Sequence, residues 1–258
     1  MINPDFLIIG AAKAATTSLS IMLREHPDVA FSKIKEPHFF SNPNKFALGW
    51  SWYRSLYDHK EQGNITGEAS TSYSRIRSYP KVVRRIQRYL PDVKIIYMVR
   101  NPLDRIRSAY IERLSEPGFG EAYPSLEEAL VKIPAMIDSS RHFEVYSAYR
   151  DRFPVENIKI IWFEELMAEP DRVFRDLCGF LDIRQLNPVE VDQTSINSRE
   201  SVEGRLKKIG RSIENVNLEW TDKAKAFVFG EIEKDMKQFL IFFGKPENYW
   251  MDLPVQRT

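Results

Sequence analysis

Short, largely apolar runs alternate with amphipathic stretches along most of the chain. The runs at 6–9, 94–99 and 158–163 show little polar alternation, which is typical of strands buried on both faces of a sheet. Two shorter runs, at 29–31 and 64–67, indicate further strands. Because amphipathic stretches separate these runs, the pattern predicts an α/β fold with one parallel sheet flanked by helices.

The amphipathic stretches predict the helices that connect these strands. Their apolar residues recur at helical spacing, and helices are expected at 17–25, 80–90, 104–114, 170–181 and 221–243. Parallel sheets of this kind bind ligands at the carboxyl ends of their strands. The residues that follow the apolar runs are therefore the first candidates for a functional site.

The length of 258 residues suits one large α/β domain, and we expect a single domain over 1–258. Hydrophobic residues make up 43% and charged residues 28% of the chain, which is ordinary for a protein with a packed core. The formal net charge is +1, whereas proteins that grip nucleic acid nonspecifically carry a large basic excess. We expect no nucleic-acid partner, and any anion site must be local.

One cysteine, Cys178, excludes an internal disulfide and a cysteine-cluster metal site. It falls in a helical pattern and is expected to be a buried small hydrophobe. The N-terminus lacks the basic and long apolar regions of a signal peptide, and no apolar run approaches the roughly 20 residues of a bilayer span. We expect a cytoplasmic protein without membrane association; the sequence leaves the oligomeric state open.

The first apolar run leads directly into Gly-Ala-Ala-Lys-Ala-Ala-Thr-Thr-Ser at 10–18, and then into a helix. Such a loop aims free backbone N–H groups and the helix dipole at one spot, which favours an anion. Lys13 adds a positive charge. The segment is similar to a P-loop, but its lysine comes three positions early and Ala15 replaces the second glycine. The alternative is a helix capped by Thr16 or Thr17 with a solvated lysine.

A second polar segment follows the most apolar run. Arg100 stands at the expected carboxyl end of that strand, Asn101-Pro102 turns the chain, and Ser108 lies eight residues beyond Arg100 in the next helix. A guanidinium fork and a hydroxyl together suit a phosphate group. The alternative is that Arg100 pairs with a carboxylate such as Asp104.

Taken in order, these segments resemble the PAPS-dependent sulfotransferases, enzymes that use 3'-phosphoadenosine 5'-phosphosulfate. The loop at 10–18 is similar to their 5'-phosphosulfate loop, and 100–108 is similar to their 3'-phosphate motif. Lys-Glu-Pro-His-Phe-Phe at 35–40 resembles the segment that carries the catalytic base in the heparan-sulfate type. Gly-Glu-Ala-Ser-Thr-Ser-Tyr at 67–73 resembles the segment that lines the acceptor cleft there. The likeness spans about 5–185 and implies a P-loop, nucleotide-kinase-like fold.

The resemblance implies transfer of a sulfuryl group from PAPS, leaving PAP, to a hydroxyl or amine of a carbohydrate or natural product. It implies that the 5' end of the donor is bound by Lys13, Ala14, Ala15, Thr16, Thr17 and Ser18. Arg100 and Ser108 would bind the 3'-phosphate. A late basic loop often closes this pocket in the family, and the candidates are Lys208, Gly210 and Arg211; an ordinary solvated turn is the alternative.

The same resemblance makes Glu36 the candidate base and Lys13 the group that stabilises the leaving oxygen. His38 is either a rival base or the residue that orients Glu36. Transfer would be in-line and independent of a metal, because Arg100 stands where a nucleoside triphosphate site usually has a Mg²⁺-binding aspartate. A sulfuryl group carries less charge than a phosphoryl group, so lysine and amide donors suffice.

Three positions depart from the family. Ala15 stands where glycine is usual, Ser41 where the heparan-sulfate type often has an acid, and Ala69 where it often has lysine. The last two changes disfavour a polyanionic glycosaminoglycan as acceptor. Two other functions stay open: a P-loop kinase of small molecules, with Glu164-Glu165 as its acidic strand end, and a nucleotide-binding scaffold without activity.

Overall fold

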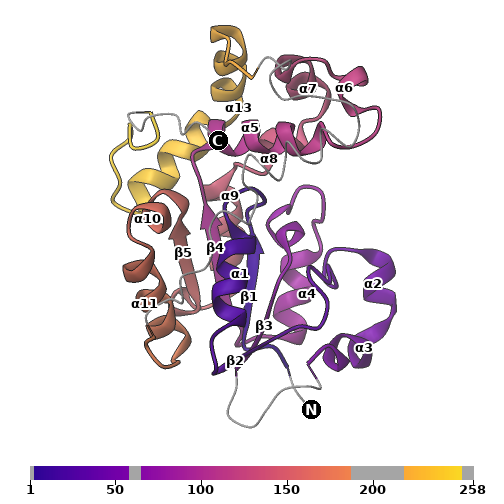
Figure 1. The fold of residues 1–258 in the computed structure, drawn as a ribbon, viewed down its shortest axis with the longest axis vertical. Coiled ribbons are helices and arrows are strands. Elements are labelled where there is room, and N and C mark those ends of the chain that lie inside the picture. Colours follow the sequence, from indigo (N-terminus) through magenta and orange to yellow (C-terminus); the bar gives the residue numbers. More distant parts are fainter. Residues whose placement is uncertain (1–2, 58–64, 187–217, 252–258) are drawn as a thin grey trace. The chain divides into compact units, whose positions relative to one another are not determined.

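The computed structural model describes residues 3–57, 65–186 and 218–251 (Figure 1). The chain divides into two compact units, the first formed by 1–99 and 145–191 and the second by 100–144 and 192–258. The predicted pocket-closing residues Lys208, Gly210 and Arg211 lie outside the described residues.

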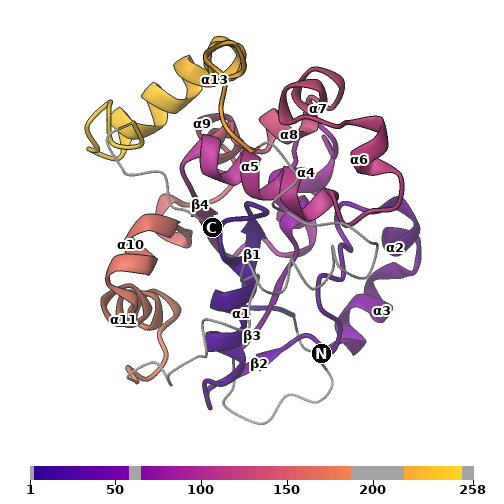
Figure 2. The same ribbon diagram turned by 45° about the horizontal axis from the view of Figure 1, so that its top comes forward.

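A five-stranded parallel sheet forms the centre of the first unit, in the order β2-β3-β1-β4-β5. Its strands are β1 (Phe6–Gly10), β2 (Val29–Phe31), β3 (Ile65–Ala69), β4 (Lys94–Val99) and β5 (Ile158–Trp162). β1 lies between β3 and β4, as both ribbon views show (Figure 1 and Figure 2). All five residues of β1 are buried, which agrees with its unbroken apolar sequence. The predicted parallel α/β sheet is confirmed.

Helices flank this sheet. The expected ones are α1 (Thr16–Arg24), α4 (Val82–Tyr89) and α11 (Pro170–Leu181), and the shorter ones are α2 (Pro43–Ala47), α3 (Gly49–Ser55) and α10 (Phe163–Ala168). α1 packs against β1, β2 and β3, while α10 and α11 pack against β5. A 3₁₀ turn, η1 (Thr71–Ser74), follows β3 directly. The predicted burial of Cys178 on α11 is confirmed.

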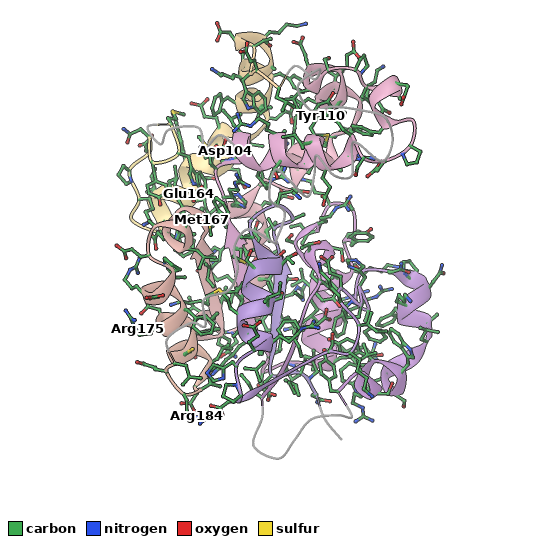
Figure 3. The ribbon with its side chains drawn as sticks, in the orientation of Figure 1. Asp104, Tyr110, Glu164, Met167, Arg175 and Arg184 are labelled. Atoms are coloured by element: carbon green, nitrogen blue, oxygen red, sulfur yellow. The ribbon has the colours of Figure 1, made fainter. Side chains whose placement is uncertain are left out.

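The second unit is helical in its described part. Its helices are α5 (Pro102–Arg113), α6 (Phe119–Ala122), α7 (Leu126–Lys132), α8 (Ala135–Asp138) and α13 (Asp222–Phe242), and α9 (His142–Arg150) begins in this unit and continues into the first. Ile106 and Tyr110 of α5 share one apolar core with Leu130 of α7 and Val228 of α13. Figure 3 marks Asp104 and Tyr110 on α5. None of the described helices combines the length and apolar character that crossing a membrane requires.

α5 begins two residues earlier than the apolar pattern predicts, because its first turn is capped. The Asn101 side chain accepts the Leu103 N–H at 3.0 Å, and Pro102 occupies the first helical position, where its missing N–H is not needed. The cap therefore starts the helix at Pro102, three residues after Val99, the last residue of β4.

A close approach of side chain to backbone joins β1 and β3. Phe6 pairs with Gly67 in the sheet register, and its ring covers the glycine so closely that a Cβ at Gly67 would overlap the ring. Both residues are buried. Glycine at this position therefore lets a large aromatic side chain fill the core beside β3.

We predict that Gly67→Ala destabilises the protein by about 1–3 kcal/mol, because the new methyl group overpacks a fixed aromatic ring. The matched control is Gly230→Ala on α13, where a Cβ meets no atom within 4 Å. Removing a glycine from a helix interior should stabilise by up to about 1 kcal/mol. Urea unfolding of both variants provides the measurement, and a Gly67→Ala variant as stable as the wild type would contradict the packing argument.

Candidate functional site

The loop between β1 and α1 has the backbone of an anion cradle. Lys13 and Ala15 have left-handed φ values of 70° and 63°. Ala15 occupies the N-cap position of α1, and its methyl side chain cannot accept hydrogen bonds from the free N–H groups of the first turn. The alternative of a threonine-capped helix is therefore wrong. With no acidic residue in that turn, the start of α1 is open to an anion.

The predicted donor-binding residues of this loop differ in exposure. Ala14 and Thr16 are buried, whereas Lys13, Ala15, Thr17 and Ser18 are half-buried. The loop is joined to the neighbouring strand by a hydrogen bond of 2.7 Å from the Ala11 N–H to the Met98 carbonyl oxygen of β4. Ala15 occupies a left-handed conformation that costs an alanine about 1–2 kcal/mol and a glycine nothing. This explains physically why glycine suits that position.

The candidate base lies on a second strained segment. Glu36 and His38 have left-handed φ values of 50° and 55°. His38 Nε2 lies 3.3 Å from Glu36 Oε2, and the Thr71 hydroxyl of η1 donates to the same oxygen at 3.0 Å. The side chains of Glu36 and His38 are 28% and 37% exposed. The carboxylate is thus held on one oxygen while remaining accessible to a substrate.

Three serines hold His38 in place. Its Nδ1 lies 2.7 Å from the Ser72 hydroxyl, and its backbone N–H donates to the Ser70 hydroxyl at 3.0 Å. The Ser41 hydroxyl lies 2.6 Å from that of Ser72 and donates to the His38 carbonyl oxygen at 3.1 Å. These contacts fix both the ring and the backbone of a residue in a conformation that non-glycine residues rarely adopt.

Burial lowers the pKa of His38 below its ordinary value of 6.5. The negative charge of Glu36 opposes this shift, and the positive charges of Arg75 and Lys45 reinforce it. The imidazole is therefore neutral near pH 7.

η1 connects the anion loop with the candidate base. Its Thr71 hydroxyl bonds Glu36, and its Ser74 side chain packs so closely on Gly10 that no Cβ fits there. Gly10 itself has a φ of 134°. The loop at the carboxyl end of β1 and the Glu36 segment therefore lie against the same 3₁₀ turn, at the carboxyl end of β3.

Glu68 is a component of this site that the sequence analysis did not single out. It lies fully buried on β3, where the hydroxyls of Tyr53 and Tyr73 donate to its Oε1 at 2.8 and 2.7 Å. The Ser70 hydroxyl donates to its Oε2 at 2.5 Å while accepting the His38 N–H. Burial raises the pKa of Glu68 from 4.5 to about 7, against the opposing effect of these hydrogen bonds. An acidic residue inside an otherwise buried strand is the sequence signal that identifies it.

In the second unit, hydrogen bonds fix the backbone around Arg100. Arg100 is 5% exposed, and its carbonyl oxygen accepts the Nε2–H of His142 at 3.2 Å. Burial lowers the pKa of His142 to about 3, so this ring is neutral. Asn101 donates from Nδ2 to the Trp250 carbonyl oxygen at 2.6 Å. Arg100 is thereby held directly before α5.

Ser108 lies half-buried on the second turn of α5. Asp104, which lies between Arg100 and Ser108 in the sequence, forms an ion pair with Arg107 through its carboxylate, at 3.0 Å. Lys13, Glu36 and His38 belong to the first unit, whereas Arg100 and Ser108 belong to the second. That the two groups bind one nucleotide stays a prediction.

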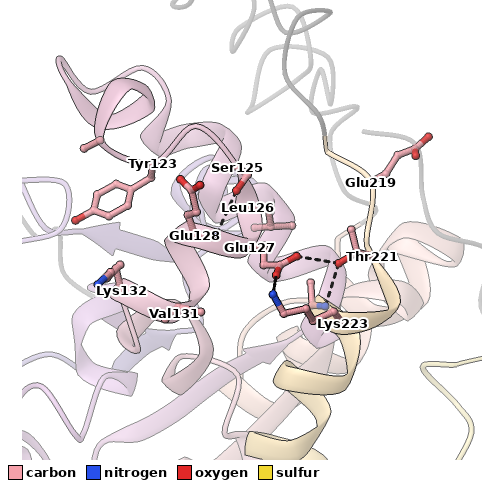
Figure 4. A pocket seen from close by; sticks show the side chains of 12 residues that line it. Tyr123, Ser125, Leu126, Glu127, Glu128, Val131, Lys132, Glu219, Thr221 and Lys223 are labelled. Carbon is pink, nitrogen blue, oxygen red and sulfur yellow. Dashed lines mark hydrogen bonds and ion pairs between the residues drawn. The ribbon is translucent and has the colours of Figure 1, made fainter.

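A pocket of about 660 Å³ lies elsewhere in the second unit, between α7 and the start of α13 (Figure 4). Among its lining residues, Glu127 forms an ion pair of 2.5 Å with Lys223 and accepts a hydrogen bond from Thr221 at 3.1 Å. None of the predicted site residues lines it. Within the described ranges, no three His, Cys, Asp or Glu residues come together as metal ligands.

Comparison with known proteins identifies relatives of this chain. A sequence model of the sulfotransferase domain matches residues 3–208. Over 189 residues the chain is 43% identical to Homo sapiens heparan sulfate glucosamine 3-O-sulfotransferase 6, covering 71% of this chain and 53% of that protein. The chain spans about half the length of the curated relatives it matches.

Two solved structures have a similar fold. A sulfotransferase from Alicyclobacillus acidocaldarius superposes with a TM-score of 0.73 at 26% identity, over 97% of this chain and 100% of that one. Mouse sulfotransferase SULT7A1, complexed with PAP, superposes with a TM-score of 0.54 at 15% identity, over 93% of this chain and 88% of that one. The second likeness concerns the fold alone, which confirms the predicted P-loop-like α/β class.

We predict that Glu68→Gln removes a pH dependence of stability. The pKa of Glu68 is raised on folding, so its stabilising proton is fully bound below about pH 4.5 and lost as the pH rises through about 7. Between pH 5 and 8 the wild type should therefore lose about 2 kcal/mol more unfolding free energy than the variant. Urea unfolding across this range provides the measurement.

The matched control for this prediction is Glu25→Gln, which changes an exposed carboxyl group to the same amide. It should follow the wild-type pH dependence. Parallel curves for the wild type and Glu68→Gln would show that the buried carboxyl does not titrate in this range.

Proposed function

This chain belongs to the sulfotransferase domain family, and we propose that it transfers a sulfuryl group from PAPS to a hydroxyl or amine acceptor, releasing PAP. The observation that carries the proposal is that η1 contacts two segments: the loop at Gly10, which leads to the uncapped start of α1, and the held carboxylate of Glu36. One feature suits the anionic 5' end of a donor, and the other suits the removal of a proton from an acceptor.

For the donor, we propose that the 5'-phosphosulfate binds the loop of Lys13, Ala14, Ala15, Thr16, Thr17 and Ser18. The left-handed backbone at Lys13 and Ala15 and the lack of a capping side chain support this assignment. Because Thr16 is buried, it would contribute its backbone N–H, whereas Thr17 and Ser18 would also contribute hydroxyls. The Ala14 N–H already donates to the Ala11 carbonyl oxygen at 3.2 Å, so Ala14 would shape the loop. Arg100 and Ser108 are proposed to bind the 3'-phosphate.

The reaction follows from these roles. The acceptor oxygen or nitrogen attacks sulfur in line, opposite the oxygen that bridges to the 5'-phosphate, and that sulfur–oxygen bond breaks. Lys13 balances the charge that develops on the leaving oxygen. Glu36 takes the acceptor's proton on Oε1, because His38 and Thr71 both contact its other oxygen, Oε2. No metal ion takes part in these steps.

The acceptor is proposed to be a small molecule or a carbohydrate of modest charge. Ser41 and Ala69, which replace charged residues of the heparan-sulfate type, are 4% and 8% exposed. Neither supplies a charge to an acceptor, which supports a substrate less anionic than a glycosaminoglycan. A single catalytic domain over 1–258, a cytoplasmic location, and the lack of nucleic-acid or membrane partners remain predictions from the sequence.

A kinase is the second candidate among enzymes. Its acidic strand end would be Glu164-Glu165, but these residues form the first turn of α10 after β5, and β4 separates β5 from β1. The Glu165 carboxylate also pairs with Arg172 at 3.4 Å. These contacts and the family membership favour sulfuryl transfer.

An assay with both donors tests the proposed function. The protein is incubated with PAPS, or with ATP and Mg²⁺, against a panel of sugars, amines and phenols, with and without EDTA. We expect acceptor-dependent formation of PAP that persists in EDTA, since no step needs a metal. Turnover of ATP that EDTA abolishes would instead identify a kinase, and tight PAP binding without turnover would identify a scaffold.

We predict that two substitutions affect different steps, one the rate of transfer and the other the binding of PAP. Glu36→Gln should lower kcat by about 10²–10⁴-fold and leave PAP affinity unchanged, because it removes the base and not the anion site. Lys13→Ala should weaken PAP binding by about tenfold or more, since it removes a charged hydrogen-bond donor. Calorimetric titration with PAP and steady-state rates separate the two effects, with the exposed Lys81→Ala as control. Full activity of Glu36→Gln would refute the assignment of the base.

A further inference from the structure

The imidazole of His38 has a polar partner at each ring nitrogen. Nε2 lies 3.3 Å from Glu36 Oε2, and Nδ1 lies 2.7 Å from Ser72 Oγ. A neutral imidazole has one N–H donor and one acceptor nitrogen, so its two partners must be of opposite kind. The identity of these partners therefore selects the tautomer.

On one side of the ring, the partner accepts. A carboxylate that is ready to take a proton has no hydrogen to donate. Glu36 Oε2 already accepts the Thr71 hydroxyl at 3.0 Å, so His38 must donate to it from Nε2. Nδ1 is then left with its lone pair and needs a donor.

On the other side, two buried hydroxyls supply that donor. Ser72 is 6% exposed, and its oxygen lies within hydrogen-bond distance of Nδ1. Its own oxygen lies 2.6 Å from the hydroxyl of Ser41, which is 4% exposed. Ser41 has one hydrogen, which can go either to the His38 carbonyl oxygen at 3.1 Å or to the nearer Ser72 oxygen. The carbonyl oxygen also accepts the Asn42 N–H at 2.9 Å, so it keeps a partner when Ser41 donates to Ser72. With Ser72 then donating to Nδ1, the hydrogens of both hydroxyls and of Nε2 are all directed toward Glu36. Each group then makes the hydrogen bonds its chemistry allows.

We propose that the Ser41–Ser72 hydroxyl pair fixes His38 in the neutral tautomer with its proton on Nε2, which makes all three residues positioning residues for Glu36. His38 is then not the base, because its only N–H is used to hold the carboxylate. None of the described residues donates to Glu36 Oε1, and this oxygen takes the proton of the acceptor. The role of Glu36 rests on the proposed function, whereas the tautomer does not.

The charges around His38 agree with a neutral ring. Besides Glu36, the groups that act on it are Arg75 and Lys45, and their positive charges disfavour a further proton. A carboxylate at position 41 would favour the doubly protonated ring. A serine at that position supplies a hydrogen-bond donor without a charge, which keeps the ring neutral while still orienting it.

Nitrogen NMR tests the tautomer directly on full-length protein labelled with ¹⁵N-histidine, without donor or acceptor. The chain has only 4 histidines, and the His38 signals are identified with a His38→Gln variant. At pH 7.5 we expect a protonated Nε2 and an unprotonated Nδ1. In Ser72→Ala this pattern should change to a mixture of tautomers. Signals of an Nδ1–H tautomer or of an imidazolium in the wild type would overturn the proposal.

Ser74→Ala is the matched control for Ser72→Ala. Ser74 is buried on the same 3₁₀ turn, but its hydroxyl donates to the Thr71 carbonyl oxygen and not to His38. It should keep the wild-type spectrum. Ser41→Ala, which removes only the outer hydroxyl, should show a smaller change in the direction of Ser72→Ala. Identical spectra for Ser72→Ala and Ser74→Ala would count against the proposal.

Kinetics then separate positioning from packing. With PAPS and a working acceptor, Ser72→Ala should lower kcat by about tenfold with little change in KM, the equivalent of one lost hydrogen bond in the transition state. Ser41→Asp should raise the pKa of His38 and add a titration to the pH profile that the wild type lacks. If PAPS is not turned over while the spectra are as expected, the proposed function fails and the tautomer assignment stands.

Discussion

The carboxyl group of Glu68 lies entirely out of water at the end of β3, and the segments around the site are arranged to satisfy it. A buried carboxyl group is costly unless several donors surround it. Tyr53 comes from α3, and Tyr73 and Ser70 come from the segment after β3. Because Ser70 also accepts the His38 N–H, the same constraint fixes the backbone of the segment that carries Glu36 and His38.

Strained backbone concentrates where the chemistry is proposed. Lys13 and Ala15 in the anion loop, and Glu36 and His38 in the base segment, have left-handed conformations. Such conformations persist only where neighbouring groups determine them, and for Glu36 and His38 the hydroxyls of η1 are among those neighbours. The anion loop needs its strain to direct N–H groups toward one point. The base segment needs it to bring Glu36 and the His38 ring together across a single proline.

Neutral hydroxyl groups provide most of the hydrogen bonds that orient the side chains of this site. Ser41, Ser70, Thr71 and Ser72 each contact Glu36, His38 or Glu68, and none of them changes the local charge. A hydroxyl can donate one hydrogen bond and accept another at the same time. Linked hydroxyls can therefore orient a neighbouring side chain without placing a charge in the protein interior.

The sequence by itself determined the parallel sheet, the helices with long apolar stripes and the strand-loop-helix junction at 10–18, because these features follow from the local order of apolar and polar residues. The Glu36 segment was predicted only from its resemblance to a family. The sequence did not determine the short helices α2 and α10, whose apolar patterns span too few residues. Only the tertiary structure decided that Glu68 is buried beside Tyr53 and that Ser72 meets His38, residues 15 and 34 positions apart. Hydrogen bonds between such distant residues depend on how the strands and η1 pack, and no local pattern encodes that packing.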